Sequence, residues 1–188
     1  MKNINYKLIL KLGVVFILVL STLFLCLVFS SSIPNEKIKD NMLVSAQKFT
    51  SLKTFSYEEG NKINGVSDNY ADSILMNISY NMGKGNPFIS SLDTGYYNGE
   101  ETGLYYGMYM TILENEAPNV DYTRYWHGSG MFVRLFHLFT DIDGMREISF
   151  YIIAALVLIT LILLIVKKYY YMAAAIAVSL MLVQFNNI

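Results

Sequence analysis

The acidic residues of this chain are confined to a single stretch. All fifteen lie between Glu36 and Glu147, and each end of that stretch leads into a long run of residues without charge. Beyond these runs, the only charged residues are lysines. With 54% of its residues hydrophobic, a chain that segregates charge in this way is typical of an integral membrane protein with a defined orientation.

Three uncharged apolar runs account for the hydrophobic content: residues 12–29, 148–166 and 169–185. As helices they would reach roughly 27, 28 and 25 Å, against roughly 30 Å for the hydrocarbon core of a bilayer. The first run also resembles a secretory signal, but its length and the lack of an Ala-x-Ala site favour an uncleaved anchor. The chain is therefore predicted to be an all-α integral membrane protein with three transmembrane helices.

The lysines predict the orientation, because short cytoplasmic segments of membrane proteins are enriched in basic residues. Residues 1–11 carry three lysines and residues 167–168 are both lysine, so both segments are expected in the cytoplasm. Residues 30–147 then form a large extracytoplasmic loop with nine basic and fifteen acidic residues, and residues 186–188 an outer end. The single cysteine, Cys26, allows no internal disulfide. A large exported loop without a disulfide is ordinary for many bacteria and unusual for eukaryotes, so the bacterial plasma membrane is the expected location.

The outer loop has the dimensions of a domain, and its apolar residues recur mostly at helical spacing. Connections are expected over 56–67 and 119–122, and either Ser67 or Asp68 is placed to cap the helix that follows. Two apolar stripes stand out: Ile38, Met42, Ala46, Phe49 and Leu52, and then Tyr70, Ile74, Leu75, Ile78 and Met82. Helices are expected over 35–52, 69–82, 104–113 and 123–139.

The first candidate for chemistry is the pair Asp68 and Asp72. Four residues apart on a helix, the two side chains share a face, and their mutual repulsion would raise one pKa unless a cation lies between them. Such a pair suits a general base or a site that uses a divalent metal ion. The simpler alternative is that Asp68 caps the helix and Asp72 is a solvated residue of its first turn.

The second candidate is the segment that holds the only tryptophan. Its cationic and hydrogen-bonding groups could grip the phosphate of a lipid-linked substrate, while its aromatic rings stack on a sugar or a headgroup. The alternative is an interfacial helix anchored among the lipid headgroups by its tryptophan and arginines. The residues concerned are Arg124, Tyr125, Trp126, His127 and Arg134.

Several classes of function have no support in the sequence. The chain has no phosphate-binding glycine loop, no CxxC or HExxH metal motif and no GxSxG nucleophile motif. It also has no basic patch of the kind that binds nucleic acid. The tyrosine-rich segment 95–117 is compatible equally with a carbohydrate-binding surface and with the small core of an exported domain.

Two segments resemble a group of large, uncharacterised bacterial multi-span membrane proteins. They are DNYADSILMNISY, which starts at Asp68, and YTRYWHGSGMFVRLFHLF, which starts at Tyr122. In that group an Asp-Asn-Tyr-x-Asp motif follows the first span, and a Tyr-x-Arg-Tyr-Trp-His-Gly motif precedes the second. The layout is similar to that of the GT-C glycosyltransferases, which take sugars from polyprenyl-phosphate donors.

The resemblance implies a reaction and roles for the residues. Asp68 would be the catalytic acidic residue with Asp72 in support, and Arg124, His127 and Arg134 would bind phosphate. Trp126 would face the donor or the acceptor, an envelope glycan, lipid or protein. GT-C enzymes have more than three spans, so the chain is expected to be the N-terminal part of a longer protein. The competing hypothesis is a non-enzymatic, membrane-anchored binding or assembly protein of the cell envelope.

Overall fold

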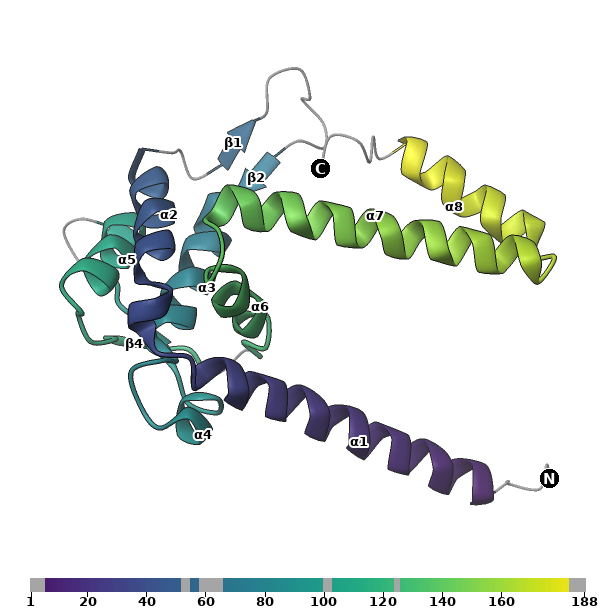
Figure 1. The fold of residues 1–188 in the computed structure, drawn as a ribbon, viewed down its shortest axis with the longest axis horizontal. Helices are drawn as coiled ribbons and strands as arrows, with labels where there is room; N and C mark the ends of the chain where they lie inside the picture. Colours follow the sequence, from purple (N-terminus) through teal and green to yellow (C-terminus); the bar gives the residue numbers. More distant parts are fainter. Residues whose placement is uncertain (1–5, 52–54, 58–65, 100–102, 124–125, 183–188) are drawn as a thin grey trace.

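A computed structural model describes residues 6–51, 55–57, 66–99, 103–123 and 126–182 and shows a mostly helical chain (Figure 1). Two long helices project from the same side of a smaller helical domain, and a third helix folds back on the second (Figure 1). The helices are α1 (Tyr6–Ser31), η1 (Asn35–Lys37), α2 (Lys39–Ser51), α3 (Asn69–Asn81), α4 (Pro87–Ser90), α5 (Gly103–Leu113), α6 (Gly130–Phe136), α7 (Ile142–Val166) and α8 (Tyr170–Leu182).

The two long helices are α1, with 26 residues, and α7, with 25. Each is long and apolar enough to cross a membrane, and almost none of its apolar surface is buried against the rest of the chain. The structure therefore confirms that the first two apolar runs are helices that could span a bilayer. Both enter the helical domain at their ends nearest the acidic segment.

The third apolar run forms α8, which has 13 described residues. A helix of this length reaches about 20 Å, less than the hydrocarbon core. It packs against α7 through a tight turn in which Lys168 has a positive φ of 63°. Residues 183–188 of the predicted run and outer end lie outside the described part, so a third span remains a prediction.

The helical domain is built around α3, which contacts α2, α5 and α6. The stripe predicted for the first helix is confirmed, because Ile38, Met42, Ala46 and Phe49 are all fully buried. Leu52, its last member, lies outside the described residues. These side chains pack on Met76, Tyr80, Met108 and Ile112 to form the main core.

The stripe predicted for α3 is only partly right. Ile78 and Met82 are buried, but Tyr70 is 48% exposed. Because α3 is surrounded by other helices, some of its polar residues are buried as well, namely Asn69, Ser73, Asn77 and Asn81. Asn77 shows why they are tolerated, because its side chain bonds both the N–H and the C=O of Tyr97 and the hydroxyl of Thr111.

The segment between the two long helices was expected to be mostly helical, and it also contains two short antiparallel strand pairs that were not predicted. β1 (Phe55–Tyr57) pairs with β2 (Val66–Asp68), inside a segment expected to be a plain connection. β3 (Gly95–Tyr96) pairs with β4 (Val120–Asp121), and β4 lies in the segment 119–122 that was expected to be a turn. A Cβ on Gly95 would lie 2.5 Å from the carbonyl oxygen of Val120, so the close approach of β4 needs glycine.

The helix expected over 123–139 is much shorter than predicted. α6 has only seven residues, Gly130–Phe136, and Trp126 and His127 lie in the turn before it. Gly128 and Gly130 explain the late start, because glycine is a poor helix former. Gly130 also lets α6 approach α3, since a Cβ there would lie 3.0 Å from both Met82 Sδ and Ser79 Oγ.

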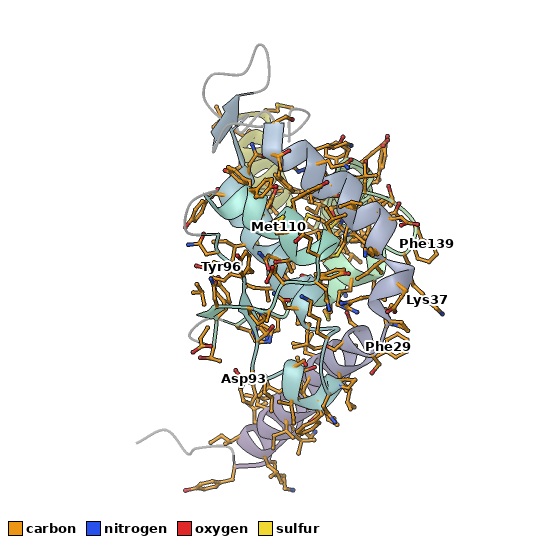
Figure 2. All side chains as sticks on the ribbon, turned by 90° about the vertical axis from the view of Figure 1, so that its left-hand side faces the viewer. Phe29, Lys37, Asp93, Tyr96, Met110 and Phe139 are labelled. Carbon is orange, nitrogen blue, oxygen red and sulfur yellow. The ribbon has the colours of Figure 1, made fainter. Side chains whose placement is uncertain are left out.

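α4 is a single helical turn that the sequence analysis did not predict. Asn86 caps it by accepting hydrogen bonds from the N–H groups of Phe88 and Ile89, and Pro87 occupies its first position. It lies beside the domain end of α1, as two perpendicular views show (Figures 1 and 2). Ser91 and Leu92, which follow this turn, border a cavity together with Trp126.

Candidate functional site

Two cavities meet at Trp126 and His127. The larger, of about 470 Å³, lies against the domain end of α1 and is called the α1 groove. The smaller, of about 260 Å³, lies against α3 and is called the α3 pocket. The α1 groove is lined by Leu20, Leu23, Phe24 and Leu27 of α1, by Ser91, Leu92 and Thr123, and by Trp126 and His127. The α3 pocket is lined by Tyr70, Ala71, Ile74, Leu75, Ile78, Tyr122, Trp126, His127 and Ser129.

His127 carries an unsatisfied polar atom in this site. Its side chain is 6% exposed, and its Nε2 lies 3.1 Å from the carbonyl oxygen of Ser91. A carbonyl only accepts hydrogen bonds, so Nε2 is the protonated nitrogen. Nδ1 is buried and has no partner among the described residues. A buried acceptor of this kind costs about 1–3 kcal/mol, which a ligand hydroxyl that donates to Nδ1 would recover. An ionised phosphate only accepts hydrogen bonds, so it would pair with Nδ1 when both ring nitrogens carry a proton.

Trp126 forms the wall shared by the two cavities. Its indole is 71% exposed, although it is the largest apolar side chain of the segment. The ring lies directly over Gly128, where a Cβ would overlap it. Glycine at 128 therefore sets the position of the indole, which presents an aromatic face at the mouth of a mainly apolar groove.

Arg134 is fully buried, and most of its N–H groups donate to the protein itself. Its guanidinium donates from Nε to the Ser30 carbonyl at 2.9 Å, from Nη1 to the Ser79 carbonyl at 2.7 Å and to Asn35 Oδ1 at 2.9 Å, and from Nη2 to the Ile33 carbonyl. No carboxylate among the described residues pairs with it. Burial lowers the pKa of Arg134 to about 10, so it stays charged near neutral pH. In this arrangement Arg134 joins α6 to α3 and to the end of α1, and four of its five N–H groups donate to the protein itself.

The acidic pair is also engaged in structural contacts. Asp68 caps α3 by accepting a hydrogen bond from the Ala71 N–H at 3.0 Å, which confirms the capping prediction. Asp72 Oδ2 lies 2.5 Å from an Nη atom of Arg146 on α7. A cation therefore neutralises Asp72, and that cation is an arginine of the second long helix. Neither carboxylate is among the residues that line the two cavities.

The other predictions concerned Arg124, Tyr125 and a divalent metal ion. Arg124 and Tyr125 lie outside the described residues, between Thr123 of the α1 groove and Trp126. Within the described residues, no group of three or more His, Cys, Asp or Glu side chains is arranged to hold a metal ion. Ser91 and Leu92 were not predicted as site residues, although Asn86-Pro87, a few residues before them, is a recognisable helix-start signal.

A third cavity, of about 540 Å³, is polar and includes Asn35, Glu36, Lys39, Tyr80 and Lys84 in its lining. The Lys84 ammonium donates to the Glu116 carbonyl at 2.5 Å and lies 5.5 Å from the centre of the Tyr80 ring. Burial lowers the pKa of Lys84 to about 8. Because its lysine is already partnered, this cavity is a weaker candidate than the site at His127.

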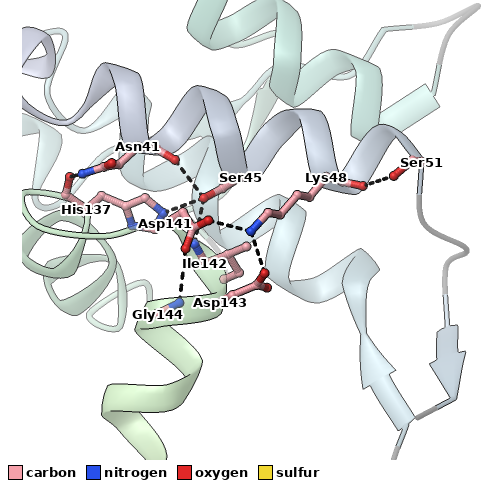
Figure 3. Close-up of polar contacts among 9 residues, drawn as sticks. All are labelled: Asn41, Ser45, Lys48, Ser51, His137, Asp141, Ile142, Asp143 and Gly144. Carbon is pink, nitrogen blue, oxygen red and sulfur yellow. Dashed lines mark hydrogen bonds and ion pairs between the residues drawn. The ribbon is translucent and has the colours of Figure 1, made fainter. Parts of the chain in front are cut away.

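A hydrogen-bonded cluster fixes the start of α7 to α2 (Figure 3). Ser45 Oγ accepts from the Ile142 N–H at 2.8 Å and lies 3.1 Å from His137 Nε2, while His137 Nδ1 donates to the Val133 carbonyl at 2.7 Å. Lys48 Nζ lies 2.5 Å from one oxygen of Asp141 and one of Asp143. These ion pairs lower the pKa of Asp141 and raise that of Lys48. The domain is thus attached to α7 here and to α1 at Arg134.

The cluster predicts a pH dependence of stability. Burial lowers the pKa of His137 below its ordinary value of 6.5. Between the lowered pKa and 6.5, the unfolded chain binds a proton that the folded protein does not, so stability is full above about pH 6.5 and falls as the pH drops. The Tm should fall less between about pH 7.5 and 5.5 in His137→Gln than in the wild type. Both proteins keep His127, so identical slopes would contradict the role given to His137.

Comparisons of the chain with models of protein families, with curated proteins and with solved structures gave no match. Function is therefore inferred from the contacts of the chain's own residues.

Proposed function

We propose that α1 and α7 cross the plasma membrane of a bacterial cell and that the acidic domain between them lies outside the cytoplasm. The support is the length and apolar surface of both helices, together with the lysines at residues 1–11 and 167–168. The third run, 169–185, completes a multi-pass arrangement with the N-terminus in the cytoplasm. In this placement the α1 groove lies at the outer face of the bilayer and opens along the side of the first span.

The function that this geometry supports best is binding of a membrane-embedded, lipid-linked substrate by its headgroup. The carrying observation is the buried, unpaired Nδ1 of His127 at a groove whose other wall is the apolar side of a span. A lipid chain can lie along Leu20 and Leu23, as far as the hydrocarbon region extends, while its polar end meets His127 and the exposed face of Trp126. A groove with an apolar wall and one convergent polar group is typical of a ligand site.

A polyprenyl-phosphate-linked sugar fits these three features. The polyprenyl chain would follow α1, the phosphate would accept a hydrogen bond from His127 in its protonated state, and the sugar would stack on Trp126. Arg124 and Tyr125 are proposed to complete the phosphate and sugar contacts. Arg134 acts indirectly in this proposal, because its N–H groups hold the end of α1 against the domain that carries His127.

The proposed reaction is transfer of the sugar to a hydroxyl of an envelope glycan, lipid or protein. Asp68 would take the proton of that hydroxyl, with Asp72 in support, and further spans of a longer protein would complete the active site. Asp68 is exposed at the start of α3, close in sequence to Tyr70 of the α3 pocket. The alternative is a non-enzymatic binding protein of the cell envelope, which the engagement of Asp68 in capping and of Asp72 with Arg146 favours.

Binding can be tested with the protein in nanodiscs, because Trp126 is the only tryptophan and its fluorescence reports on the groove. Polyprenyl phosphate should change the emission in a saturable manner, and the matching polyprenol, which lacks the phosphate, should bind at least about tenfold more weakly. His127→Ala should weaken binding of the phosphate by about tenfold or more, since it removes a charge-assisted hydrogen bond.

The other histidine of the chain provides the matched control. His137 is buried at the C-terminal end of α6 and lines neither cavity, so His137→Gln should leave the affinity for polyprenyl phosphate unchanged. Equal affinities for the phosphate and the alcohol, together with an unchanged affinity in His127→Ala, would remove the proposed site.

A further inference from the structure

α4 and the turn after it present apolar side chains that the domain does not cover. Phe88, Ile89 and Leu92 are 56%, 59% and 57% exposed. Residues 87–92 contain no ionisable side chain, so this surface offers no charge to a protein or peptide partner. Exposed apolar groups clustered in this way mark a surface that meets another apolar phase.

The position of α4 against α1 indicates what that phase is. The ring of Phe88 meets the ring of Phe24 edge-on, with 5.2 Å between centroids, and Leu92 lines the α1 groove with Leu20 and Leu23. Phe24 lies five residues inside the outer end of the first apolar run, which corresponds to a depth of about 7–8 Å at the helical rise. The apolar surface of α4 is therefore continuous with that of the span at the boundary of headgroups and acyl chains.

We infer that α4 and Leu92 insert into the outer leaflet of the bilayer and form, with Trp126, an interfacial anchor beside the first span. This inference rests on the membrane placement proposed above and adds a second point of attachment for the domain. The occupant of the surface is lipid, because the surface is uncharged and continues the lipid-facing side of α1. Insertion here would also hold the mouth of the α1 groove open to lipids of the outer leaflet.

Single-tryptophan variants test the insertion without any added ligand. In a Trp126→Phe background, Ile89→Trp reports on α4, Leu18→Trp on the span, and Leu113→Trp on α5, which lies across the domain from the long helices (Figure 1). Each variant is reconstituted in phosphatidylcholine vesicles and exposed to quenchers, namely brominated acyl chains in the bilayer and iodide in the water. All three positions are exposed, so a tryptophan needs no repacking of the core.

The expected result is that brominated lipid quenches Ile89→Trp and Leu18→Trp strongly, whereas iodide quenches Leu113→Trp. If Ile89→Trp responds to iodide as Leu113→Trp does, α4 is in water and the inference is wrong. If Ile89→Trp responds to neither quencher, protein covers α4, which also overturns it. Quenching of Leu18→Trp decides separately whether α1 is in the membrane, and the titration with polyprenyl phosphate decides separately whether His127 binds a headgroup.

Discussion

Arg134→Ala should abolish cooperative unfolding of the helical domain near neutral pH. The substitution leaves two buried backbone carbonyls, one part-buried carbonyl and the part-buried side-chain oxygen of Asn35 without their donor, and it opens a cavity where a fully buried side chain stood. Buried acceptors without a partner cost about 1–3 kcal/mol each, so the loss should be about 4 kcal/mol or more. Near-UV circular dichroism of the full chain in nanodiscs, followed during urea titration, measures it.

Arg146→Ala is the matched control for this prediction. Arg146 is also an arginine that connects the domain to a long helix, but its side chain is 37% exposed and its ion pair with Asp72 is solvated. Loss of such a pair should shift the free energy of unfolding by about 1 kcal/mol or less. Equal effects of the two substitutions would contradict the role assigned to Arg134. A modest effect of Arg134→Ala would instead leave this arginine free for a ligand.

Asn77→Ala is expected to be the second large effect. Asn77 is fully buried, and its amide bonds the N–H and C=O of Tyr97, the Thr111 hydroxyl and the Asn81 amide. Its removal leaves the part-buried backbone groups of Tyr97 and the buried side chains of Thr111 and Asn81 without these partners, at an expected cost of about 3 kcal/mol. For a domain of this size, the Tm should fall by roughly 12 °C or more.

Asn119→Ala is the matched control, because Asn119 makes the same pair of hydrogen bonds to the backbone of Asn98, the residue that follows Tyr97. Its side chain accepts from the Asn98 N–H at 2.8 Å and donates to the Asn98 C=O at 2.9 Å, but it is exposed. Water can replace both bonds, so the expected change in Tm is only a few degrees. A larger fall in Tm for Asn77→Ala than for Asn119→Ala would show that burial of the hydrogen bonds causes the difference. Similar changes in the two variants would contradict it.

The long helices and α2 were predictable because their residues follow simple rules. A long uncharged apolar run is expected to form a helix, because its backbone groups must bond to each other in an apolar environment. The spacing of Ile38, Met42, Ala46 and Phe49 matches one face of a helix. The buried face of α3 was harder to predict, because a helix that is surrounded on several sides has no single apolar stripe. Its buried asparagines are also of a residue type that is usually found on the surface. The two-residue strands depend on a tertiary approach at Gly95 that periodicity does not reveal.

The candidate site was predictable in part. A tryptophan, a histidine and two arginines within eleven residues drew attention to this segment, and His127 and Trp126 do border cavities. Whether an arginine faces a ligand or its own protein depends on tertiary contacts, so sequence alone did not reveal that Arg134 binds carbonyls. The same holds for Asp72, whose partner Arg146 is 74 residues away.

Photo-cross-linking with a polyprenyl phosphate analogue tests the central claim most directly. The analogue carries its photoreactive group beside the phosphate and is incorporated into nanodiscs that contain the full chain, and the labelled peptides are mapped by mass spectrometry. The account predicts labels at Ser91–Leu92, at Trp126–Ser129 and on the part of α1 between Leu20 and Leu27, with the labels at the first two sites reduced in His127→Ala. Labels confined to α7 and α8, or a pattern unchanged in His127→Ala, would contradict it.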